Sequence, residues 1–228
     1  MSTAKVSQPL ATGERLTRDE FLRRWEELPD LKCAELLEGV VYVPSPLTVS
    51  HGAQDNVVSV WLGYYAGFTP VCQAGNQATW LMLEDAPQPD IYLRILAEYG
   101  GQSRTERGFG SGAPELVVEV AVSSAARDLG PKLRLYRQAG VREYITVLTK
   151  ESRVVWRRLV AGDWKVLEPG PGGLQRSVVF PGLWLDASAL LRGDIPRLLE
   201  VLQQGLESPE RREFVESLAA RKSGSQRP

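Results

Sequence analysis

The chain has 228 residues, 43% of them hydrophobic and 24% charged, with a formal net charge of −1. These are ordinary values for a globular protein, and the length suits one full domain with extensions. A net charge this close to zero excludes bulk attraction to a polyanion, so any contact with nucleic acid must be local.

Neither the N-terminal sequence nor the cysteines predict export. The first residues carry one lysine but no apolar core behind it, and no apolar run approaches the roughly 18 residues that a membrane span needs. The only two cysteines, Cys33 and Cys72, are too few and too distant for a disulfide framework or a zinc cluster. We interpret both as reduced structural thiols and expect a soluble, cytoplasmic protein with no membrane partner.

The first part of the chain predicts a helix, a strand region and a second helix. Residues 16–30 have apolar side chains at helical spacing, and Pro29 stops the predicted helix. Residues 34–46 predict a bent strand or hairpin that carries Gly39 and ends at the prolines. The second helix begins near His51.

The next part predicts short strands at residues 71–84 and 90–99, separated by the turn-forming residues 85–89. The glycine-rich, polar residues 100–114 are typical of a mobile surface loop. No internal repeat accompanies these mixed α and β patterns.

A strand–helix–strand unit follows. Residues 115–122, "ELVVEVAV", form a nearly continuous apolar run, which is typical of a central strand covered on both faces. Residues 127–144 change to helical spacing, with Gly140 placed to end the helix, and residues 143–149 predict the next strand.

The last third predicts hairpin strands over residues 152–186 and two terminal helices at residues 194–206 and 208–222. The apolar faces of these helices suggest docking or self-association, so a homodimer is one expectation. We expect residues 223–228 to be disordered.

Glu119 interrupts the central strand with a carboxylate among aliphatic residues. Strand alternation places Val117, Glu119 and Ala121 on one face. A buried, unpaired carboxylate is costly, so Glu119 predicts a cation beside it. That cation could be Arg94 or Lys132 in a structural ion pair, or a metal ion.

Asp90 stands at the start of another predicted strand, directly after a proline. Mg²⁺ is usually bound by one or two carboxylates together with waters and phosphate oxygens, so Asp90 and Glu119 on neighbouring strands would suit it. The alternative is that Asp90 only caps a turn.

Lys132 lies on the helix after the central strand and could reach back toward the end of that strand. The alternative is an exposed pair with Asp128, one helical turn earlier. Across residues 127–143, five basic residues outnumber two acidic ones, which gives a local charge of +3. Such a patch suits a phosphate backbone, although a solvated helix face has the same pattern.

These motifs, in this order and spacing, resemble the Uma2 family, also known as DUF820. The resemblance covers residues 16–187 and rests on "AELLEGVVYVPSP" followed by His51, Asp90 in "PDIYL", Glu119 in "ELVVEVAVSS" and the downstream "RDLGPKLRLYRQAGVREYITV". It implies an α/β fold with a restriction-endonuclease-like PD-(D/E)XK core, in which helices flank a mixed central β-sheet, with an added β-hairpin region and C-terminal helices.

The resemblance also implies a division of the chain into three parts. These are a flexible N-terminus over residues 1–15, a nuclease-like domain over residues 16–187, and a helical C-terminal extension over residues 188–228 with a disordered end.

For the site, the resemblance implies an endonuclease that hydrolyses DNA phosphodiester bonds with Mg²⁺, or with Mn²⁺ in its place. The metal would be held by Asp90 and Glu119, with Glu35 as a further acidic ligand. The wider superfold has its lysine two positions after the acidic residue, where this chain has Ala121. The family supplies the lysine from the next helix, which makes Lys132 the third catalytic candidate.

Two further residues are candidates for supporting this site. His51 is the only histidine and is either structural or a hydrogen-bond partner of the ligands, and Tyr136 lies one helical turn after Lys132. Two alternatives to the enzyme stay open. One is a catalytically degenerate module that binds nucleic acid or a protein partner, and the other is a purely structural protein in which the carboxylates only form ion pairs.

Overall fold

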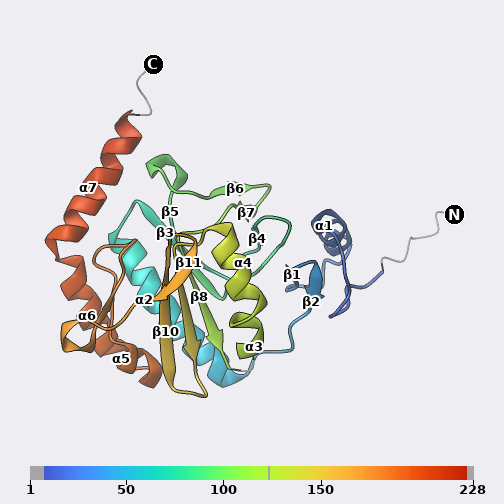
Figure 1. Ribbon diagram of the computed structural model, residues 1–228, viewed down its shortest axis with the longest axis horizontal. Helices are drawn as coiled ribbons and strands as arrows, with labels where there is room; N and C mark the ends of the chain where they lie inside the picture. Colours follow the sequence, from blue (N-terminus) through green and yellow to red (C-terminus); the bar gives the residue numbers. More distant parts are fainter. Residues whose placement is uncertain (1–7, 123, 225–228) are drawn as a thin grey trace.

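A six-stranded mixed sheet forms the centre of the structure (Figure 1). The structure is a computed structural model that describes residues 8–122 and 124–224. The strand order is β11-β10-β9-β8-β5-β3. The bounds are Cys72–Asn76 for β3, Ile91–Ile95 for β5, Leu116–Ala121 for β8, Glu143–Leu148 for β9, Arg153–Val160 for β10 and Asp163–Val166 for β11. The β8–β9 pair is parallel and the other pairs are antiparallel, which confirms the predicted mixed sheet.

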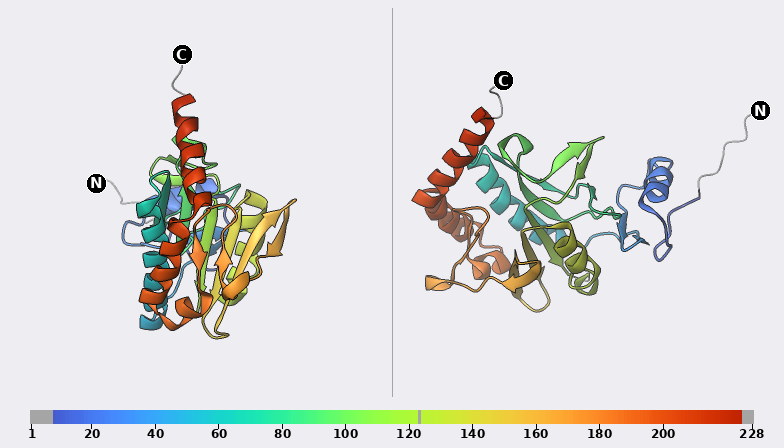
Figure 2. Two further views of the ribbon diagram at one scale, coloured as in Figure 1. Left: turned by 90° about the vertical axis from the view of Figure 1, so that its left-hand side faces the viewer. Right: turned by 45° about the horizontal axis from the view of Figure 1, so that its top comes forward.

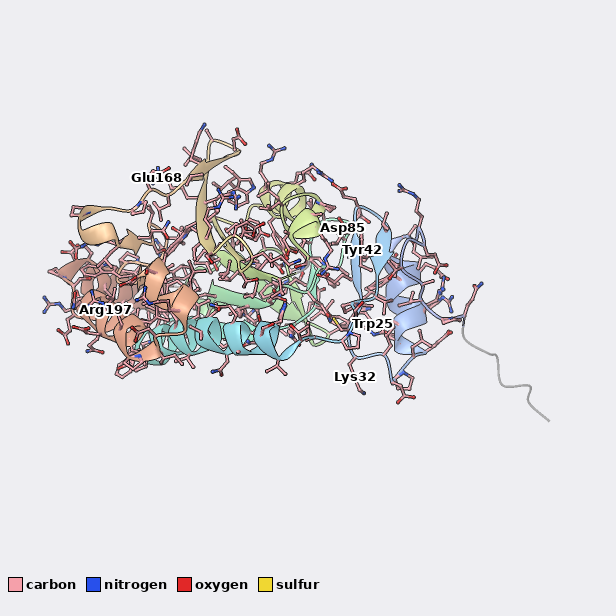
Figure 3. All side chains as sticks on the ribbon, turned by 90° about the horizontal axis from the view of Figure 1, so that it is seen from below. Trp25, Lys32, Tyr42, Asp85, Glu168 and Arg197 are labelled. Carbon is pink, nitrogen blue, oxygen red and sulfur yellow. The ribbon has the colours of Figure 1, made fainter. Side chains whose placement is uncertain are left out.

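Helices cover both faces of this sheet, so every residue of β8 and β9 is buried. One face packs on α2 (Val49–Phe68), α5 (Ala187–Arg192) and α6 (Ile195–Leu206). The other face packs on α4 (Pro131–Ala139), and Figures 2 and 3 show α2 and α4 on opposite sides of the sheet.

The register of the sheet brings the two key carboxylates to one end. In the antiparallel β5–β8 pair, Ile91 is opposite Val118. Asp90 directly precedes β5, and Glu119 is the next residue of β8, so both lie at the same end of this pair. Within β8, Glu119 shares its face with Val117, and Val117 packs in the cluster that includes α4.

A small unit at the N-terminal end consists of α1 (Arg18–Glu26) and the hairpin of β1 (Glu35–Leu37) and β2 (Val40–Tyr42). It lies at the opposite end of the molecule from α7 (Pro209–Gly224) (Figure 1). Of the two forms expected for this segment, a bent strand or a hairpin, the structure has the hairpin, and Gly39 lies in its turn with a positive φ of 72°. An antiparallel bridge between Leu36 and Ala86 connects this unit to the segment before β5.

Residues 8–15, part of the segment expected to be flexible, pack against this unit. The Arg24 guanidinium donates to the Gln8 and Pro9 carbonyls and pairs with Glu14. Leu10 is buried in the same small core as Phe21. Residues 1–7 of the expected segment lie outside the described residues.

The prediction of a mobile loop over residues 100–114 is wrong for most of this segment. This segment contains β6 (Arg104–Glu106) and β7 (Phe109–Ser111), which form a hairpin and pair with β4 (Trp80–Leu81) in a three-stranded sheet. The turn residues Arg107 and Gly108 have φ values of 51° and 87°. Two successive residues with positive φ allow a tight hairpin, so the polar and glycine-rich composition serves a turn.

The helix predicted for residues 127–144 is divided into α3 (Ala125–Asp128) and α4. Gly130 separates them with non-helical angles, and Pro131 begins α4, where its missing N–H costs no hydrogen bond. Gly140 ends α4 in a left-handed conformation, as predicted.

The C-terminal region contains the predicted hairpin of β10 and β11 and a second, short pair, β12 (Gln175–Arg176) and β13 (Trp184–Leu185). The two predicted terminal helices are α6 and α7, and α5 is an additional one. Leu198 of α6 and Leu218 of α7 belong to the same core cluster as Val118, so the expected extension shares the core of the domain.

Two further expectations concern the C-terminal residues and membrane-spanning helices. The helix α7 extends to Gly224, and residues 225–228 of the expected disordered end lie outside the described residues. Among the helices described, none is both long enough and apolar enough to cross a membrane.

Candidate metal and phosphate site

A cleft of about 640 Å³ opens where β5 begins and β8 ends. The structure brings most of the predicted site residues together in its lining, and these are Glu35, His51, Asp90, Glu119 and Lys132. The remaining one, Tyr136, lies behind Glu119 and donates its hydroxyl to Glu119 Oε1 at 2.7 Å. The cleft therefore joins α2, β8, α4 and the N-terminal hairpin at one end of the sheet.

Lys132 is shared between two carboxylates inside this cleft. Its Nζ lies 2.8 Å from Glu35 Oε1 and donates to Glu119 Oε1 and Oε2 at 2.9 and 3.0 Å. The side chain is only 2% exposed, so the alternative of a surface pair with Asp128 is wrong. Burial alone would lower the pKa of Lys132, but the carboxylates of Glu119 and Glu35 raise it well above its usual value, so the ammonium group stays charged.

Lys132 is the cation that pairs with Glu119. The other candidate, Arg94, donates to Gln73 and to Thr105 instead. Burial raises the pKa of Glu119 well above its usual value, Lys132 opposes that rise, and the charge of Asp90 adds to it. Since Lys132 and Tyr136 only donate to Glu119, they favour the ionised carboxylate, and they leave Oε2 with a free acceptor position.

Glu35 comes from β1 of the N-terminal hairpin and closes the cleft on that side. Its Oε1 accepts from the Gln88 amide at 2.8 Å, and its Oε2 lies 3.8 Å from Arg127 Nε. Sequence patterns gave no signal for Gln88, whose carbonyl also accepts from Lys132 at 3.2 Å. The segment before β5 therefore fixes both members of the Glu35–Lys132 pair.

Asp90 is oriented by the strand beside it. Its Oδ2 accepts from the backbone N–H of Val120 at 2.7 Å, and Val120 directly follows Glu119. This contact with a neighbouring strand is different from the turn cap that was the alternative for Asp90. One carboxylate oxygen is thus fixed by the backbone, which sets the direction of the other.

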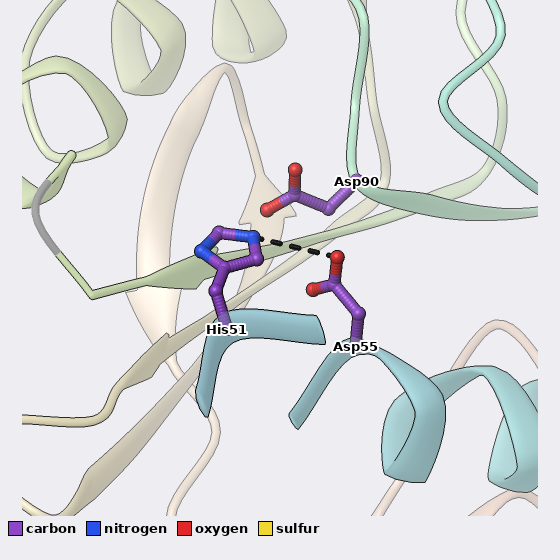
Figure 4. A group of neighbouring side chains, drawn as sticks. All are labelled: His51, Asp55 and Asp90. Carbon is purple, nitrogen blue, oxygen red and sulfur yellow. Dashed lines mark ion pairs between the residues drawn. The ribbon is translucent and has the colours of Figure 1, made fainter. Parts of the chain in front are cut away.

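His51 and Asp55 form the α2 side of the site (Figure 4). Thr48 caps α2 by accepting from the His51 N–H at 3.3 Å, and His51 Nε2 lies 3.4 Å from Asp55 Oδ2. Burial raises the pKa of Asp55 to about 6; the charge of Asp90 adds to the rise and His51 opposes it. Sequence reasoning missed Asp55, although a position four residues after His51 on a predicted helix was a usable signal.

The basic patch predicted for residues 127–143 is not one open surface. Lys132 is buried, Arg134 pairs with Glu38 at 2.7 Å, and Arg137 pairs with Asp163 at 3.3 Å. In contrast, Arg127 and Lys150 line the cleft itself. Positive charge available to a ligand is therefore concentrated beside the carboxylates.

Both cysteines are free thiols. Burial raises the pKa of Cys33 to about 11 and that of Cys72 to about 12. Thiols that stay protonated at neutral pH are poor nucleophiles and poor metal ligands, which agrees with the structural role predicted for both.

The donor set of the cleft fits a divalent metal ion. Glu119 keeps a free acceptor position on Oε2, and Asp90 has one oxygen that the Val120 amide does not use. The nitrogen and carboxylate oxygens of His51, Asp55 and Asp90 lie within 4.8 Å of one another. Carboxylate oxygens converging on a cleft with buried walls are the ligands that hard divalent ions prefer.

Comparison with known proteins relates the chain to one family. The family model described as "Uma2: Putative restriction endonuclease" matches residues 18–188. A solved structure, described as a putative nuclease belonging to DUF820 from Anabaena variabilis ATCC 29413, matches with a TM-score of 0.61 and 17% identity, over 78% of this chain and 98% of that chain. At this identity the likeness shows the fold alone. None of the curated proteins compared with the chain matches it.

Proposed function

The chain belongs to the Uma2 family, and we propose that its cleft hydrolyses phosphodiester bonds of DNA with a bound divalent metal ion. The family supports a nuclease function, and the metal dependence and the DNA substrate are the parts that we propose. The observation that carries the proposal is the buried lysine of α4. Lys132 binds both oxygens of the mid-strand Glu119, beside Asp90 in one cleft.

Asp90 and Glu119 are the proposed metal ligands, with Glu35 as a further acidic residue near them. These three carboxylates offer only oxygen atoms, which favours Mg²⁺, with Mn²⁺ as a substitute. A divalent ion bound there would neutralise charge on the scissile phosphate and lower the pKa of a bound water.

The protein contributes groups that are already in position. Lys132 opposes the rise that burial causes in the pKa of Glu119, and its ammonium group can stabilise the negative charge that develops on the phosphate. Tyr136 fixes the Glu119 carboxylate by its hydroxyl, and the Val120 N–H fixes Asp90. Because the protein's own groups hold both carboxylates, little reorganisation accompanies the reaction.

Arg127 and Lys150 are the proposed contacts to the DNA backbone. Both line the cleft, and the guanidinium of Arg127 lies 5.8 Å from the Tyr42 ring centroid, which limits its freedom. A protein with a net charge of −1 needs such local contacts, since its overall charge gives no attraction to phosphates.

The test is cleavage of supercoiled plasmid by the full chain in EDTA, in Mg²⁺ and in Mn²⁺. We expect nicked or linear products only with metal, and a loss of about 10²-fold or more in rate for Asp90→Asn, as for the removal of one catalytic electrostatic group. Glu38→Gln, on the surface pair with Arg134, is the matched control and should cleave like the wild type. Equal rates for Asp90→Asn and the wild type would contradict the proposed site. RNA of the same sequence, tested in parallel, tells whether DNA is preferred.

A second function, binding without catalysis, is favoured by one observation. Lys132 pairs with Glu35 and Glu119 at once, as it would in a purely structural ion network. This candidate predicts that labelled duplex DNA binds without metal and is never cleaved. Cleavage by the wild type that disappears in Asp90→Asn would exclude it.

A further inference from the structure

We infer that His51 and Asp55 of α2, together with Asp90, bind a divalent transition-metal ion on the α2 side of the cleft. The inference rests on the proposed function, because it adds a metal position to the same cleft and shares Asp90 with it. It assigns to α2 a direct role in metal binding, whereas His51 was expected to be at most a hydrogen-bond partner of the ligands.

The separations between the three donor groups suit a common ion (Figure 4). Their ligand atoms lie within 4.8 Å of one another, and His51 Nε2 lies 3.4 Å from Asp55 Oδ2. Two ligand atoms that each lie about 2.1 Å from one ion at a tetrahedral angle are about 3.4 Å apart. The same separation is long for a charge-assisted hydrogen bond, which is usually about 2.7–2.9 Å.

Two buried polar atoms of this group have no hydrogen-bond partner among the described residues. They are His51 Nε2 and Asp55 Oδ1, and the histidine is only 9% exposed. Buried polar groups are nearly always satisfied, so such atoms in a cleft call for a water or an ion. Both atoms belong to side chains that converge on Asp90, which favours a single ion as their common partner.

The charges around Asp55 and Asp90 lead to the same conclusion. In the described part of the chain, no lysine or arginine forms an ion pair with either carboxylate, and Lys132 is already engaged by Glu35 and Glu119. Two carboxylates this close repel each other unless a cation lies between them. A divalent ion would supply the missing positive charge.

The ligands of α2 are held by a rigid element. His51 and Asp55 are four residues apart, so they project from the same face of a 20-residue helix. Further along the helix, Val58 and Trp61 are fully buried in the main core, which fixes α2 against the sheet. The Val120 N–H holds Asp90 on the other side, so the three donors are preorganised from two elements.

The imidazole nitrogen of His51 determines which metals suit this position. Carboxylate and water ligands suit Mg²⁺, Ca²⁺ and Mn²⁺, whereas imidazole nitrogen suits Zn²⁺, Cu²⁺, Fe²⁺ and Ni²⁺. A site with one nitrogen and carboxylate oxygens should therefore bind Zn²⁺ or Co²⁺ more tightly than Mg²⁺.

The sole histidine of the chain gives a direct test. The untagged, metal-free full chain is titrated with Zn²⁺ and, separately, with Mg²⁺, while the imidazole ¹⁵N and ¹H resonances are recorded. We expect Zn²⁺ to shift the Nε2 resonance of His51 with saturation at one equivalent, and Mg²⁺ at the same concentration to change it far less. An imidazole spectrum that Zn²⁺ leaves unchanged would overturn the inference.

Variants separate ligation from folding. Calorimetric titration with Zn²⁺ should show at least tenfold weaker binding for Asp55→Asn and for His51→Gln, and unchanged binding for Glu38→Gln. Far-UV circular dichroism and the melting temperature without metal show whether each variant is folded. Equal Zn²⁺ affinity in folded Asp55→Asn and in the wild type would contradict the assignment.

Failure of this inference and failure of the proposed function have different signatures. If Zn²⁺ binds through His51 and Asp55 while plasmid DNA is never cleaved, the metal site stands and the nuclease proposal fails. If Mg²⁺-dependent cleavage occurs but neither the histidine resonances nor Zn²⁺ affinity depends on these residues, the nuclease proposal stands and this inference fails.

Discussion

Lys132 is the only lysine or arginine within 3.5 Å of a Glu35 or Glu119 carboxylate oxygen in the part of the chain that the structure describes. Removing one partner of a buried ion pair leaves an uncompensated charge, whereas removing both can be nearly neutral. The stability of the cleft therefore depends on keeping the three charges together, whatever chemistry occurs there.

We predict that Lys132→Met lowers the free energy of unfolding by about 3–5 kcal/mol. Adding Glu119→Gln to this variant should recover part of the loss, because it removes one of the stranded carboxylates. Urea denaturation of the two single variants and the double variant measures the coupling. Additive losses in the double variant would show that the two side chains do not interact.

Tyr136→Phe removes a single hydrogen bond to Glu119 and leaves the ring in place. A hydrogen bond to a charged group contributes about 1.5–3 kcal/mol, so we expect a loss of that size in the free energy of unfolding. Tyr144→Phe, which removes a hydroxyl donor to the Asp128 carbonyl, is a comparison with a neutral acceptor and should lose less. Thermal denaturation that ranks the two variants the other way would contradict an ionised Glu119.

At this scale the sequence singled out residues that the structure places in one cleft, because the signals are local. Glu119 was conspicuous among valines, and Asp90 and Lys132 followed from the spacing of neighbouring elements. Asp55 was missed because a carboxylate on a helix is normally solvated. Only the packing of α2 against the sheet end places it beside Asp90.

At the scale of elements, the hairpin of β6 and β7 shows where local patterns fail. Its glycines and polar residues are typical of a loop, but β7 pairs in parallel with β4, about thirty positions earlier in the chain. Gly110 also allows the Trp80 ring to lie directly against the backbone. A long-range pairing and a close approach of this kind leave no trace in a local sequence window.

Substitution of Gly110 tests this packing. A Cβ added there would lie 2.3 Å from the Trp80 ring, so Gly110→Ala should lower the free energy of unfolding by about 1–3 kcal/mol through overpacking. A Cβ added at Gly63 in α2 would meet no atom within 4 Å, so Gly63→Ala should stabilise by about 0.5–1 kcal/mol. Equal effects of the two substitutions in urea denaturation would contradict the observed contact.

At the scale of the whole molecule, the C-terminal helices belong to the main core. Leu198, Leu202 and Leu218 pack in one cluster with Trp61 and Val118, and Phe214 and Val215 pack against it. The apolar faces that suggested self-association thus contact the chain's own core. Periodicity predicted the individual helices and strands, and the mixed sheet with flanking helices was what the resemblance to the Uma2 family implied. Neither tells which apolar face packs against which.

A chain that ends at residue 187 should therefore not fold as a separate domain. It would lose α5, α6 and α7 and expose the α2 face of the core, so we expect aggregation or a molten state. Near-UV circular dichroism and proteolysis compare it with the full chain. A cooperatively unfolding, protease-resistant fragment would show that residues 188–228 are a dispensable extension.

The central claim is that Asp90 and Glu119 hold a divalent metal ion beside Lys132. The most direct measurement is the anomalous difference density of crystals grown in Mn²⁺, recorded on both sides of the manganese absorption edge. The account predicts a peak within about 2.0–2.2 Å of carboxylate oxygens from both Asp90 and Glu119. Density with no manganese peak in the cleft, and with Lys132 still joining Glu35 to Glu119 at saturating Mn²⁺, would contradict it.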